Sequence, residues 1–264
     1  MYAKLLAEAW REQNEKTEEL AHAVAGTSMR HSMSGKCARQ IHYYLTHEAV
    51  TNPFDLPGVW ATGLGSRIHV WWQDALRAAY PDAEVEVTVS IPGADSSGHV
   101  DATVWEDGEL TSLELKSING FGFKKMAESG DGPRYSDMVQ CCVNAYGLGA
   151  KKAVLLYLSL EAVSRSRAVR KGLEEHERIM KEFHFDEEQI KEVAETELVR
   201  WADIRTAGPN TPRSLPDPEY APGTVVTDPA TGKLELNGVV SGYAWQCGYC
   251  AYQLKCADDC KSGV

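Results

Sequence analysis

The chain has 264 residues, 43% of them hydrophobic and 25% charged, with a formal net charge of −11. This composition excludes a disordered chain and gives enough length for a core, while the acidic balance argues against broad, nonspecific coating of nucleic acid. No apolar run approaches the roughly 18 residues that a membrane span needs, and the charged N-terminal stretch does not read as a signal peptide. Seven cysteines without a secretory signal favour a reducing compartment. We therefore expect a cytoplasmic protein, not associated with membranes, with metal or thiol chemistry.

The first third of the chain is predicted to be mainly helical. Helical periodicity covers residues 2–24, a second helix is expected from Ser34 through Leu45, and a loop follows over 51–58. A third helix is expected from Thr62 to Ala79. Its apolar residues recur at the spacing of a core-facing stripe and are Leu64, Ile68, Trp71, Trp72, Ala75 and Leu76.

A strand is expected from Glu84 to Ile91, and a β-hairpin over residues 98–117 follows it. Asp107-Gly108 lies between two runs rich in Val, Thr, Trp and Leu, which is the strongest short-range hairpin signal. With this dipeptide as the two-residue loop, Glu106 pairs with Glu109, and counting back places Asp101 opposite Glu114. The alternating face is apolar and is expected to pack inward; it carries Val100, Ala102, Val104, Leu113 and Leu115.

Two carboxylates placed opposite each other repel unless a cation or a shared proton compensates. Lys116 lies on the same strand face as Glu114 because strand side chains alternate. Asp101, Glu114 and Lys116 therefore converge. Carboxylate oxygens select Mg²⁺ or Mn²⁺, which can activate water, and an ammonium group can offset negative charge. Each residue alone would more often belong to a solvated strand face, but the three together predict a divalent-metal hydrolytic site.

The second half of the chain combines one clear helix and one clear strand with less regular segments. We expect a mobile basic loop over 118–135, a helix over 136–148 and a buried strand over 152–160. Residues 165–206 are expected to form one or two charged helices. After them we expect a proline-rich extended stretch over 208–223, a small hairpin within 225–240 around Thr231-Gly232, and a cysteine-rich end.

The expected organisation is a single domain, 1–264. Its parts are an N-terminal helical part (1–60), a catalytic core (61–160), a helical or loop insertion (161–238) and the cysteine-rich segment (239–264).

Two further residues fit the same site. His69, on the helix before the sheet, could bring a nitrogen ligand to the metal, although a lone helical histidine is more often structural; its neighbour Arg67 is a candidate phosphate contact. Gln140, on the helix after the basic loop, could position substrate or water, helped by Asn144 one turn later. Further basic candidates for nucleic-acid contact are Lys124, Lys125, Arg134, Lys151 and Lys152.

The cysteine-rich end carries Cys247, Cys250 and Cys256, one thiolate short of a four-coordinate site. The fourth ligand is either Cys260 nearby or Cys37 more than two hundred residues away. Tetrahedral thiolates suit Zn²⁺ or an iron–sulfur cluster, and the spacing alone leaves both open. Cys141 and Cys142 occupy apolar helix positions and are expected to be core thiols.

Taken in order, these residues resemble a known family. Gly65-x-x-x-His69, Gly98-x-x-Asp101, Glu114-x-Lys116 and Gln140 resemble the RecB-like branch of the PD-(D/E)XK nuclease superfamily. With the four cysteines added, the chain is similar to the iron–sulfur CRISPR-associated exonucleases (the fourth Cas protein) and their phage-encoded relatives. Two features depart from the family pattern: the helix carries Asn144 where a tyrosine usually follows the glutamine, with Tyr146 nearby, and 161–238 has no assignable motif.

The resemblance implies an α/β fold: a central mixed β-sheet flanked by helices, as in a restriction-endonuclease-like core, with a helical insertion and a C-terminal Fe–S-bound segment. It implies a [4Fe-4S] cluster on four cysteines and Mg²⁺ or Mn²⁺ on His69, Asp101, Glu114 and the backbone carbonyl of Leu115, with Lys116 as the catalytic lysine. The implied cluster ligands are Cys37, Cys247, Cys250 and Cys256, and Cys260 is left as a spare thiol.

These inferences make a metal-dependent DNA exonuclease the leading hypothesis, acting on single strands or duplex ends in a prokaryotic or phage-infected cell. Asp101, Glu114, Lys116 and Gln140 form its expected catalytic set, and Arg67, Lys124, Lys125, Arg134 and Tyr146 are its DNA-binding candidates. The alternatives are a catalytically silent zinc- or Fe–S-containing nucleic-acid-binding module, or an adaptor in a recombination or CRISPR-adaptation complex. The sequence also leaves room for an oligomer.

Overall fold

The computed structural model describes residues 8–9, 12, 28–129, 132–214, 224–227, 232–237 and 245–263. The chain divides into two compact units. The first, called here the sheet unit, comprises Arg30–Ser34 and Gly63–Leu198; the second, the cysteine unit, comprises Met1–Met29, Gly35–Thr62 and Val199–Val264. The helix predicted over 2–24 lies almost wholly outside the described residues, and the single domain stays a prediction.

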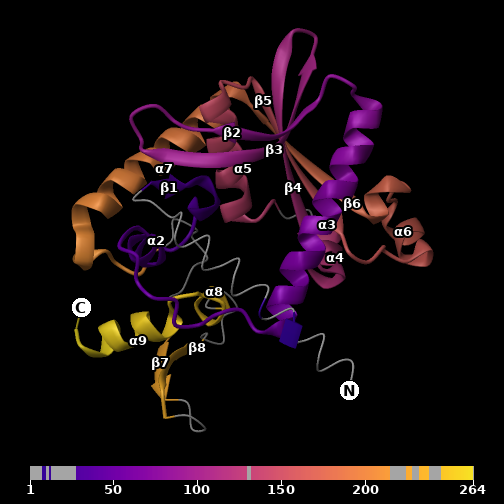
Figure 1. Cartoon of the computed structure of the whole chain (residues 1–264). Helices are drawn as coiled ribbons and strands as arrows, with labels where there is room; N and C mark the ends of the chain where they lie inside the picture. The colour runs from indigo at the N-terminus through magenta and orange to yellow at the C-terminus, as the bar shows by residue number, and fades with distance from the viewer. Residues whose placement is uncertain are drawn as a thin grey trace. The chain divides into compact units, whose positions relative to one another are not determined.

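A mixed β-sheet forms the centre of the sheet unit, as predicted (Figure 1). Its strand order is β1-β3-β4-β5-β6, with β2 also pairing with β3; β4 and β5 are parallel and the neighbouring pairs β2–β3, β3–β4 and β5–β6 are antiparallel. The strands are β1 (Met29–Arg30), β2 (Glu84–Val89), β3 (Ser96–Glu106), β4 (Glu109–Ile118), β5 (Lys152–Ser159) and β6 (Met180–Asp186).

The β3–β4 hairpin has the predicted turn and register. Asp107 and Gly108 have φ values of 54° and 79°, as a primed two-residue turn requires. Pairing runs from Glu106–Glu109 to Ala102–Leu113. The pairing ends one pair before Asp101 and Glu114, so these two residues flank the point where backbone pairing of the hairpin stops. We predicted that Asp101 pairs directly with Glu114, but this pair is not part of the ladder.

Helices pack on this sheet. α5 contacts β3, β4 and β5 and is part of the crossover between the parallel strands β4 and β5. Gly149, with φ 67°, ends α5 in the left-handed conformation. The helices, some of which continue into the cysteine unit, are η1 (His31–Met33), α3 (Leu56–Ala79), α4 (Gly120–Ser129), α5 (Tyr135–Leu148), α6 (Arg165–Lys171), η2 (His176–Arg178) and α7 (Glu187–Ala207).

The hairpin's inward face is buried as predicted. Val100, Ala102, Val104 and Leu115 are all buried, and Leu113 is half-buried. A neighbouring apolar core forms around Phe123, Leu155 and Tyr157, and it includes Cys141 of α5. Cys142 is also buried, so both adjacent thiols of α5 are core residues as expected.

The prediction of a mobile basic loop over 118–135 is wrong, because α4 occupies most of it. The glycines that suggested mobility serve close packing. A Cβ atom on Gly120 would collide with the side chain of Glu161, and one on Gly122 would lie 3.1 Å from Ile118. The apolar residues Phe123 and Met126 anchor α4 in the core.

The prediction of only charged helices over 165–206 is also wrong, because this segment contains the strand β6. Phe183 and Phe185 alternate with charged residues along β6 and pack against the core, which is the period of a half-buried strand. The helical periodicity of the longer α7 obscured this short alternation.

Helix α3 begins at Leu56, within the predicted loop, and turns a different face inward than predicted. Trp71 is 62% exposed and Ala75 is exposed, whereas Gln73 is 5% exposed. The remaining predicted stripe residues, Leu64, Ile68, Trp72 and Leu76, are half-buried. The inward side of α3 therefore includes polar side chains, which hydrophobicity alone assigns to solvent.

The cysteine unit combines short helices with the predicted small hairpin. Helix α2 starts at Ala38, after Cys37, rather than at Ser34. Strands β7 and β8 pair antiparallel, and Tyr43, Tyr252 and Cys256 share one apolar cluster with Val225 and Leu234 of this hairpin. The unit's own elements are α2 (Ala38–Leu45), η3 (Gly208–Asn210), β7 (Thr224–Thr227), β8 (Leu234–Asn237), α8 (Trp245–Gly248) and α9 (Gln253–Lys261).

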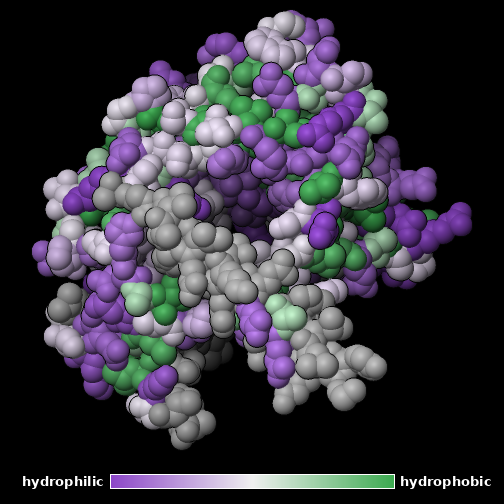
Figure 2. All heavy atoms as spheres, viewed as in Figure 1, coloured by the Kyte–Doolittle hydropathy of each residue, from purple (hydrophilic) through white to green (hydrophobic). Residues whose placement is uncertain are grey.

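Hydrophilic residues cover most of the face seen in Figure 2, with hydrophobic ones scattered among them. Among the described residues, no helix combines the length and the apolar character that crossing a membrane requires.

Candidate active site

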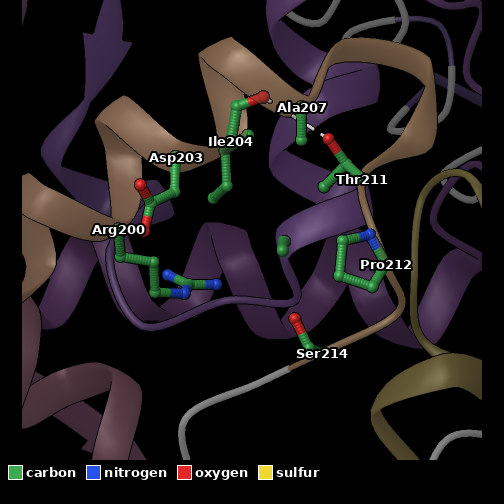
Figure 3. Close-up of a pocket in the computed structure, with 8 residues that line it drawn as sticks. Arg200, Asp203, Ile204, Ala207, Thr211, Pro212 and Ser214 are labelled. Atoms are coloured by element: carbon green, nitrogen blue, oxygen red, sulfur yellow. Dashed lines mark hydrogen bonds between the residues drawn. The ribbon is translucent and has the colours of Figure 1, made fainter.

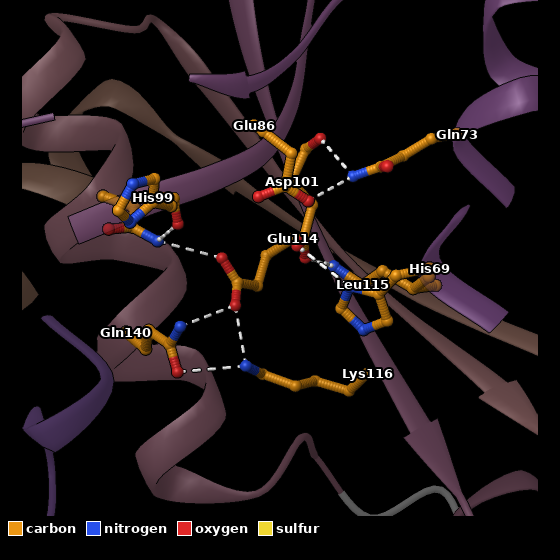
Figure 4. A network of polar contacts seen from close by, with 10 residues as sticks. His69, Gln73, Glu86, His99, Asp101, Glu114, Leu115, Lys116 and Gln140 are labelled. Carbon is orange, nitrogen blue, oxygen red and sulfur yellow. Dashed lines mark hydrogen bonds and ion pairs between the residues drawn. The ribbon is translucent and has the colours of Figure 1, made fainter. Parts of the chain in front are cut away.

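Asp101 lies where the β3–β4 ladder ends, and its side chain is held by both neighbouring elements. Its Oδ2 accepts a hydrogen bond of 2.7 Å from the backbone N–H of Leu115 on β4. Its Oδ1 lies 3.0 Å from Nδ1 of His69 on α3 (Figure 4). The structure thus brings together the predicted residues Asp101, His69 and Leu115.

Glu114 is 3% exposed and accepts three hydrogen bonds. Its Oε1 accepts from Lys116 Nζ at 2.7 Å and from Gln140 Nε2 at 2.8 Å, while Oε2 accepts from Asn144 Nδ2 at 2.9 Å. Lys116 Nζ also donates to Gln140 Oε1 at 3.0 Å, closing a ring of three side chains (Figure 4). The four residues expected to form the catalytic set are therefore all in one neighbourhood.

The charges of this site alter its pKa values. Burial raises the pKa of Glu114, and the nearby ammonium of Lys116 opposes that rise. Burial lowers the pKa of Lys116, but the carboxylates of Glu114, Asp137 and Asp101 outweigh it and the pKa lies above its ordinary value. The hydrogen bond to Asp101 raises the pKa of His69. Lys116 is therefore an ammonium at neutral pH, and it donates hydrogen bonds to Glu114 and Gln140.

Sequence reasoning missed two contributors on the Asp101 side. Gln73 Nε2, on α3, donates to Glu86 Oε1 at 2.6 Å and to the backbone carbonyl of Asp101 at 3.2 Å (Figure 4). Glu86 lies in the middle of β2 with φ 53°, a conformation that non-glycine residues rarely adopt. The i, i+4 spacing of His69 and Gln73 on α3 was the available signal, because residues four apart share a helix face.

Sequence reasoning also missed His31, which lies behind Glu114. His31 Nδ1 lies 2.8 Å from Asn144 Oδ1 and His31 Nε2 lies 3.1 Å from Ser96 Oγ. Asn144 was noted only as a helper of Gln140 and as a departure from the family pattern. Nothing local in the sequence connects His31 with a residue more than a hundred positions later.

Burial lowers the pKa of His31 below its ordinary value of 6.5, and the charge of His99 adds to this effect. The unfolded chain then binds the proton first as the pH falls, so His31's contribution to stability is complete above the ordinary pKa and is lost below it. We expect the melting temperature of the wild type to fall more steeply from pH 7 to pH 5 than that of His31→Asn. The difference between the variants amounts to at most about 1.4 kcal/mol per pH unit. Parallel melting curves across this pH range would contradict the expectation.

The residues predicted to contact DNA are more widely spread over the chain's elements than the catalytic set. Arg67 is exposed, and two residues of helical rotation turn it away from the side on which His69 meets Asp101. Lys124 pairs with Glu161 at 3.1 Å, Lys151 pairs with Glu187, and Lys152 pairs with Glu109 at 2.7 Å. Of the others, Tyr146 packs against the apolar core, whereas Lys125 and Arg134 are exposed. Several of these cations are thus already partnered by carboxylates.

A separate group of thiols lies in the cysteine unit. Cys247 and Cys256 are buried in the apolar cluster with Tyr43 and Tyr252, and Cys250 packs against it. Burial raises the pKa of Cys250 to about 11 and of Cys256 to about 12. The charge of Cys260 adds to the shift of Cys256, and the charge of Cys37 adds to both shifts. The predicted ligands therefore gather in one region, and none of them is in a disulfide.

Neither group is preassembled as a metal site: in the described part of the chain, no three His, Cys, Asp or Glu side chains are arranged to hold an ion. The donor chemistry nevertheless fits. A carboxylate offers about four lone-pair positions, and the contacts above use two on Asp101 and three on Glu114, so each keeps acceptor capacity for a cation. Grouped, buried thiols fit a soft metal or an iron–sulfur cluster, whose binding would ionise them.

One pocket of about 330 Å³ lies elsewhere, within the cysteine unit (Figure 3). It is lined by the end of α7 and the segment after it, and Arg200 and Asp203 are its charged residues. Thr211 at its edge donates to the carbonyl of Gly208 at 2.6 Å, and the backbone carbonyl of Thr211 accepts from Arg39 Nε at 2.9 Å. None of the predicted site residues lines it.

No family model and no curated protein matches the chain. Among solved structures, SSO0001 aligns with 17% identity and a TM-score of 0.51, covering 96% of this chain and 94% of that one. An alkaline exonuclease from Laribacter hongkongensis aligns with 13% identity and a TM-score of 0.49, covering 71% of this chain and 93% of that one. A phage-related exonuclease from Haemophilus somnus 129PT aligns with 8% identity and a TM-score of 0.41, covering 70% and 98%. The near full-length likeness to SSO0001 shows that the chain shares its mixed α/β fold.

Proposed function

We propose that the chain is a divalent-metal-dependent nuclease that hydrolyses DNA phosphodiester bonds and acts as an exonuclease. The observation that carries this proposal is the placement of Asp101, Glu114 and Lys116 around the open end of one hairpin, with the Lys116 ammonium 2.7 Å from the Glu114 carboxylate. Two carboxylates and a lysine in this arrangement suit cleavage of a charged, phosphate-containing substrate.

Asp101, Glu114, His69 and the backbone carbonyl of Leu115 would hold Mg²⁺ or Mn²⁺. The ion, when bound, would supply Lewis-acid activation of water and neutralise negative charge on the phosphodiester. Lys116 is held by Glu114 and Gln140 and keeps its proton, so it would bind a phosphate oxygen or orient the attacking water. Gln140 bridges both groups and fixes their distance from each other.

We also propose a structural [4Fe-4S] cluster on the predicted set of Cys37, Cys247, Cys250 and Cys256, with zinc as the alternative. The support is the gathering of Cys247, Cys250 and Cys256 in one apolar cluster of the cysteine unit, with Cys37 near enough to affect the pKa of Cys250 and Cys256. A cluster would join the start of α2 to the chain's C-terminal segment, and its binding would be coupled to folding.

The test is degradation of end-labelled single- and double-stranded DNA by anaerobically purified protein. We expect cleavage with Mn²⁺ or Mg²⁺, none after chelation by EDTA, and recovery when the metal is restored. Mononucleotide release from an end, rather than internal cuts in circular DNA, would support the exonuclease assignment. DNA binding without cleavage under every metal condition would overturn the proposal in favour of a silent binding module.

A further inference from the structure

A continuous series of buried hydrogen bonds leads to Glu114 from behind. The backbone N–H of Ile91 donates to Ser96 Oγ at 3.3 Å, and Ser96 Oγ lies 3.1 Å from His31 Nε2. His31 Nδ1 lies 2.8 Å from Asn144 Oδ1, and Asn144 Nδ2 donates to Glu114 Oε2 at 2.9 Å. Ser96, His31, Asn144 and Glu114 are all buried, so water does not compete for these bonds.

The surroundings fix the orientation of the Asn144 amide and, through it, the proton on His31 Nδ1. Asn144 Nδ2 also donates to the backbone carbonyl of His99 at 3.1 Å, so a flipped amide would place its oxygen against two acceptors. Asn144 Oδ1 therefore faces His31 as an acceptor, and His31 Nδ1 must carry a proton. Ser96 Oγ accepts from the N–H of Ile91, and a neutral His31 with its proton on Nδ1 presents Nε2 as an acceptor for the Ser96 hydroxyl proton. This tautomer satisfies both the Asn144 and the Ser96 contact.

Gly98 gives independent evidence that this contact constrains the sequence. A Cβ atom at position 98 would collide with His31 Nδ1 and would lie 2.8 Å from Asn144 Oδ1. These are the two atoms joined by the His31–Asn144 hydrogen bond. The backbone of β3 at Gly98 thus passes directly under that bond, and only glycine leaves room for it.

We propose that His31, held by Ser96, is a positioning residue that orients the Asn144 amide so that it fixes the Glu114 carboxylate for metal binding and catalysis. This inference rests on the proposed function. Asn144 donates to Glu114 Oε2, whereas Lys116 and Gln140 donate to Oε1, so each carboxylate oxygen has its own donors. Losing an outer partner of a metal ligand typically costs about 10–100-fold in metal affinity or activity.

Two substitutions of His31 separate positioning from simple packing. The amide of asparagine falls near the place of His31 Nδ1 and can still donate to Asn144, whereas the amide of glutamine falls near Nε2 and reaches only Ser96. Both remove the buried ring, so both should lower the melting temperature. We expect His31→Gln to lower kcat by about 10–100-fold with little change in KM for DNA, and His31→Asn to recover most of that loss.

Controls make the comparison specific. His184→Gln alters an exposed histidine on β6, paired with Glu182 at 3.0 Å, and should match the wild type. Gly98→Ala should reproduce the kcat loss of His31→Gln through a different residue. Equal activity of the two His31 variants, whether both are impaired or both intact, would overturn the positioning role.

A readout independent of cleavage distinguishes this inference from the proposed function. ¹⁵N NMR of the imidazole at pH 7 should show a neutral His31 with its proton on Nδ1, and Mn²⁺ titration without DNA should show weaker binding in His31→Gln than in His31→Asn. If the wild type does not cut DNA but both readouts hold, only the nuclease proposal fails. A His31 proton on Nε2, or equal Mn²⁺ affinity in both variants, would overturn the positioning role of His31, whatever the cleavage activity.

Discussion

Glu114→Gln is expected to reduce metal-dependent DNA cleavage by about a thousandfold. A catalytic metal stabilises the transition state by several kcal/mol, and each 1.36 kcal/mol corresponds to a factor of ten in rate. The substitution keeps the shape of the side chain but removes the charge that would bind the ion. It also replaces one carboxylate oxygen with an amide N–H₂, which then faces either Lys116 and Gln140 or Asn144, all of which donate to the native carboxylate.

The same strand supplies a matched control. Glu109→Gln makes the identical change at an exposed glutamate at the start of β4, where the carboxylate pairs with Lys152 at 2.7 Å. An exposed ion pair contributes little to stability, so the melting temperature should change little and cleavage should match the wild type. If the melting temperature and the DNA affinity are unchanged, a lower cleavage rate reflects loss of the chemical step and not of folding or DNA binding. Equal cleavage by Glu114→Gln and the wild type would refute the site assignment.

The parts of the fold that local chemistry determines were predictable. Asp107-Gly108 sets both turn and register of the β3–β4 hairpin, and this register identified Asp101 and Glu114 as neighbours. Alternating apolar residues identified the buried face of that hairpin, and the helix predicted over 136–148 corresponds to α5. Each of these signals lies within a few residues of the element that it predicts.

The parts that tertiary contacts determine were not predictable in this way. The glycines of α4 suggest flexibility until the side chains of Ile118 and Glu161 that lie against them are known. α3 buries Gln73 and exposes Trp71 because its inward side meets the carboxylates of β2 and β3, which no hydropathy pattern records. His31 becomes a site residue only through contacts with Ser96 and Asn144, both far away in sequence.

Cys256→Ser is expected to abolish binding of the proposed cluster, whereas Cys260→Ser is expected to leave it intact. Both cysteines lie on α9, one helical turn apart, so the substitutions are matched in element and chemistry. Cys256 is buried in the apolar cluster with Cys247, while Cys260 is half-buried, packs against the same cluster and accepts a hydrogen bond of 3.7 Å from Arg39 Nη1. The proposed ligand set takes Cys37 as the fourth cysteine, so Cys260, whose sulfur accepts from Arg39, is not required.

The measurement is iron and acid-labile sulfide per chain in anaerobically purified protein, with zinc determined in the same samples. A [4Fe-4S] cluster predicts four irons and four sulfides in the wild type and in Cys260→Ser, and little of either in Cys256→Ser. Because metal binding is coupled to folding, Cys256→Ser should also melt at a lower temperature than Cys260→Ser. Zinc without sulfide would show that the same cysteines bind zinc in place of an iron–sulfur cluster. Loss of metal from both Cys256→Ser and Cys260→Ser would show that the chain uses Cys260 as the fourth ligand, the alternative that the cysteine spacing leaves open.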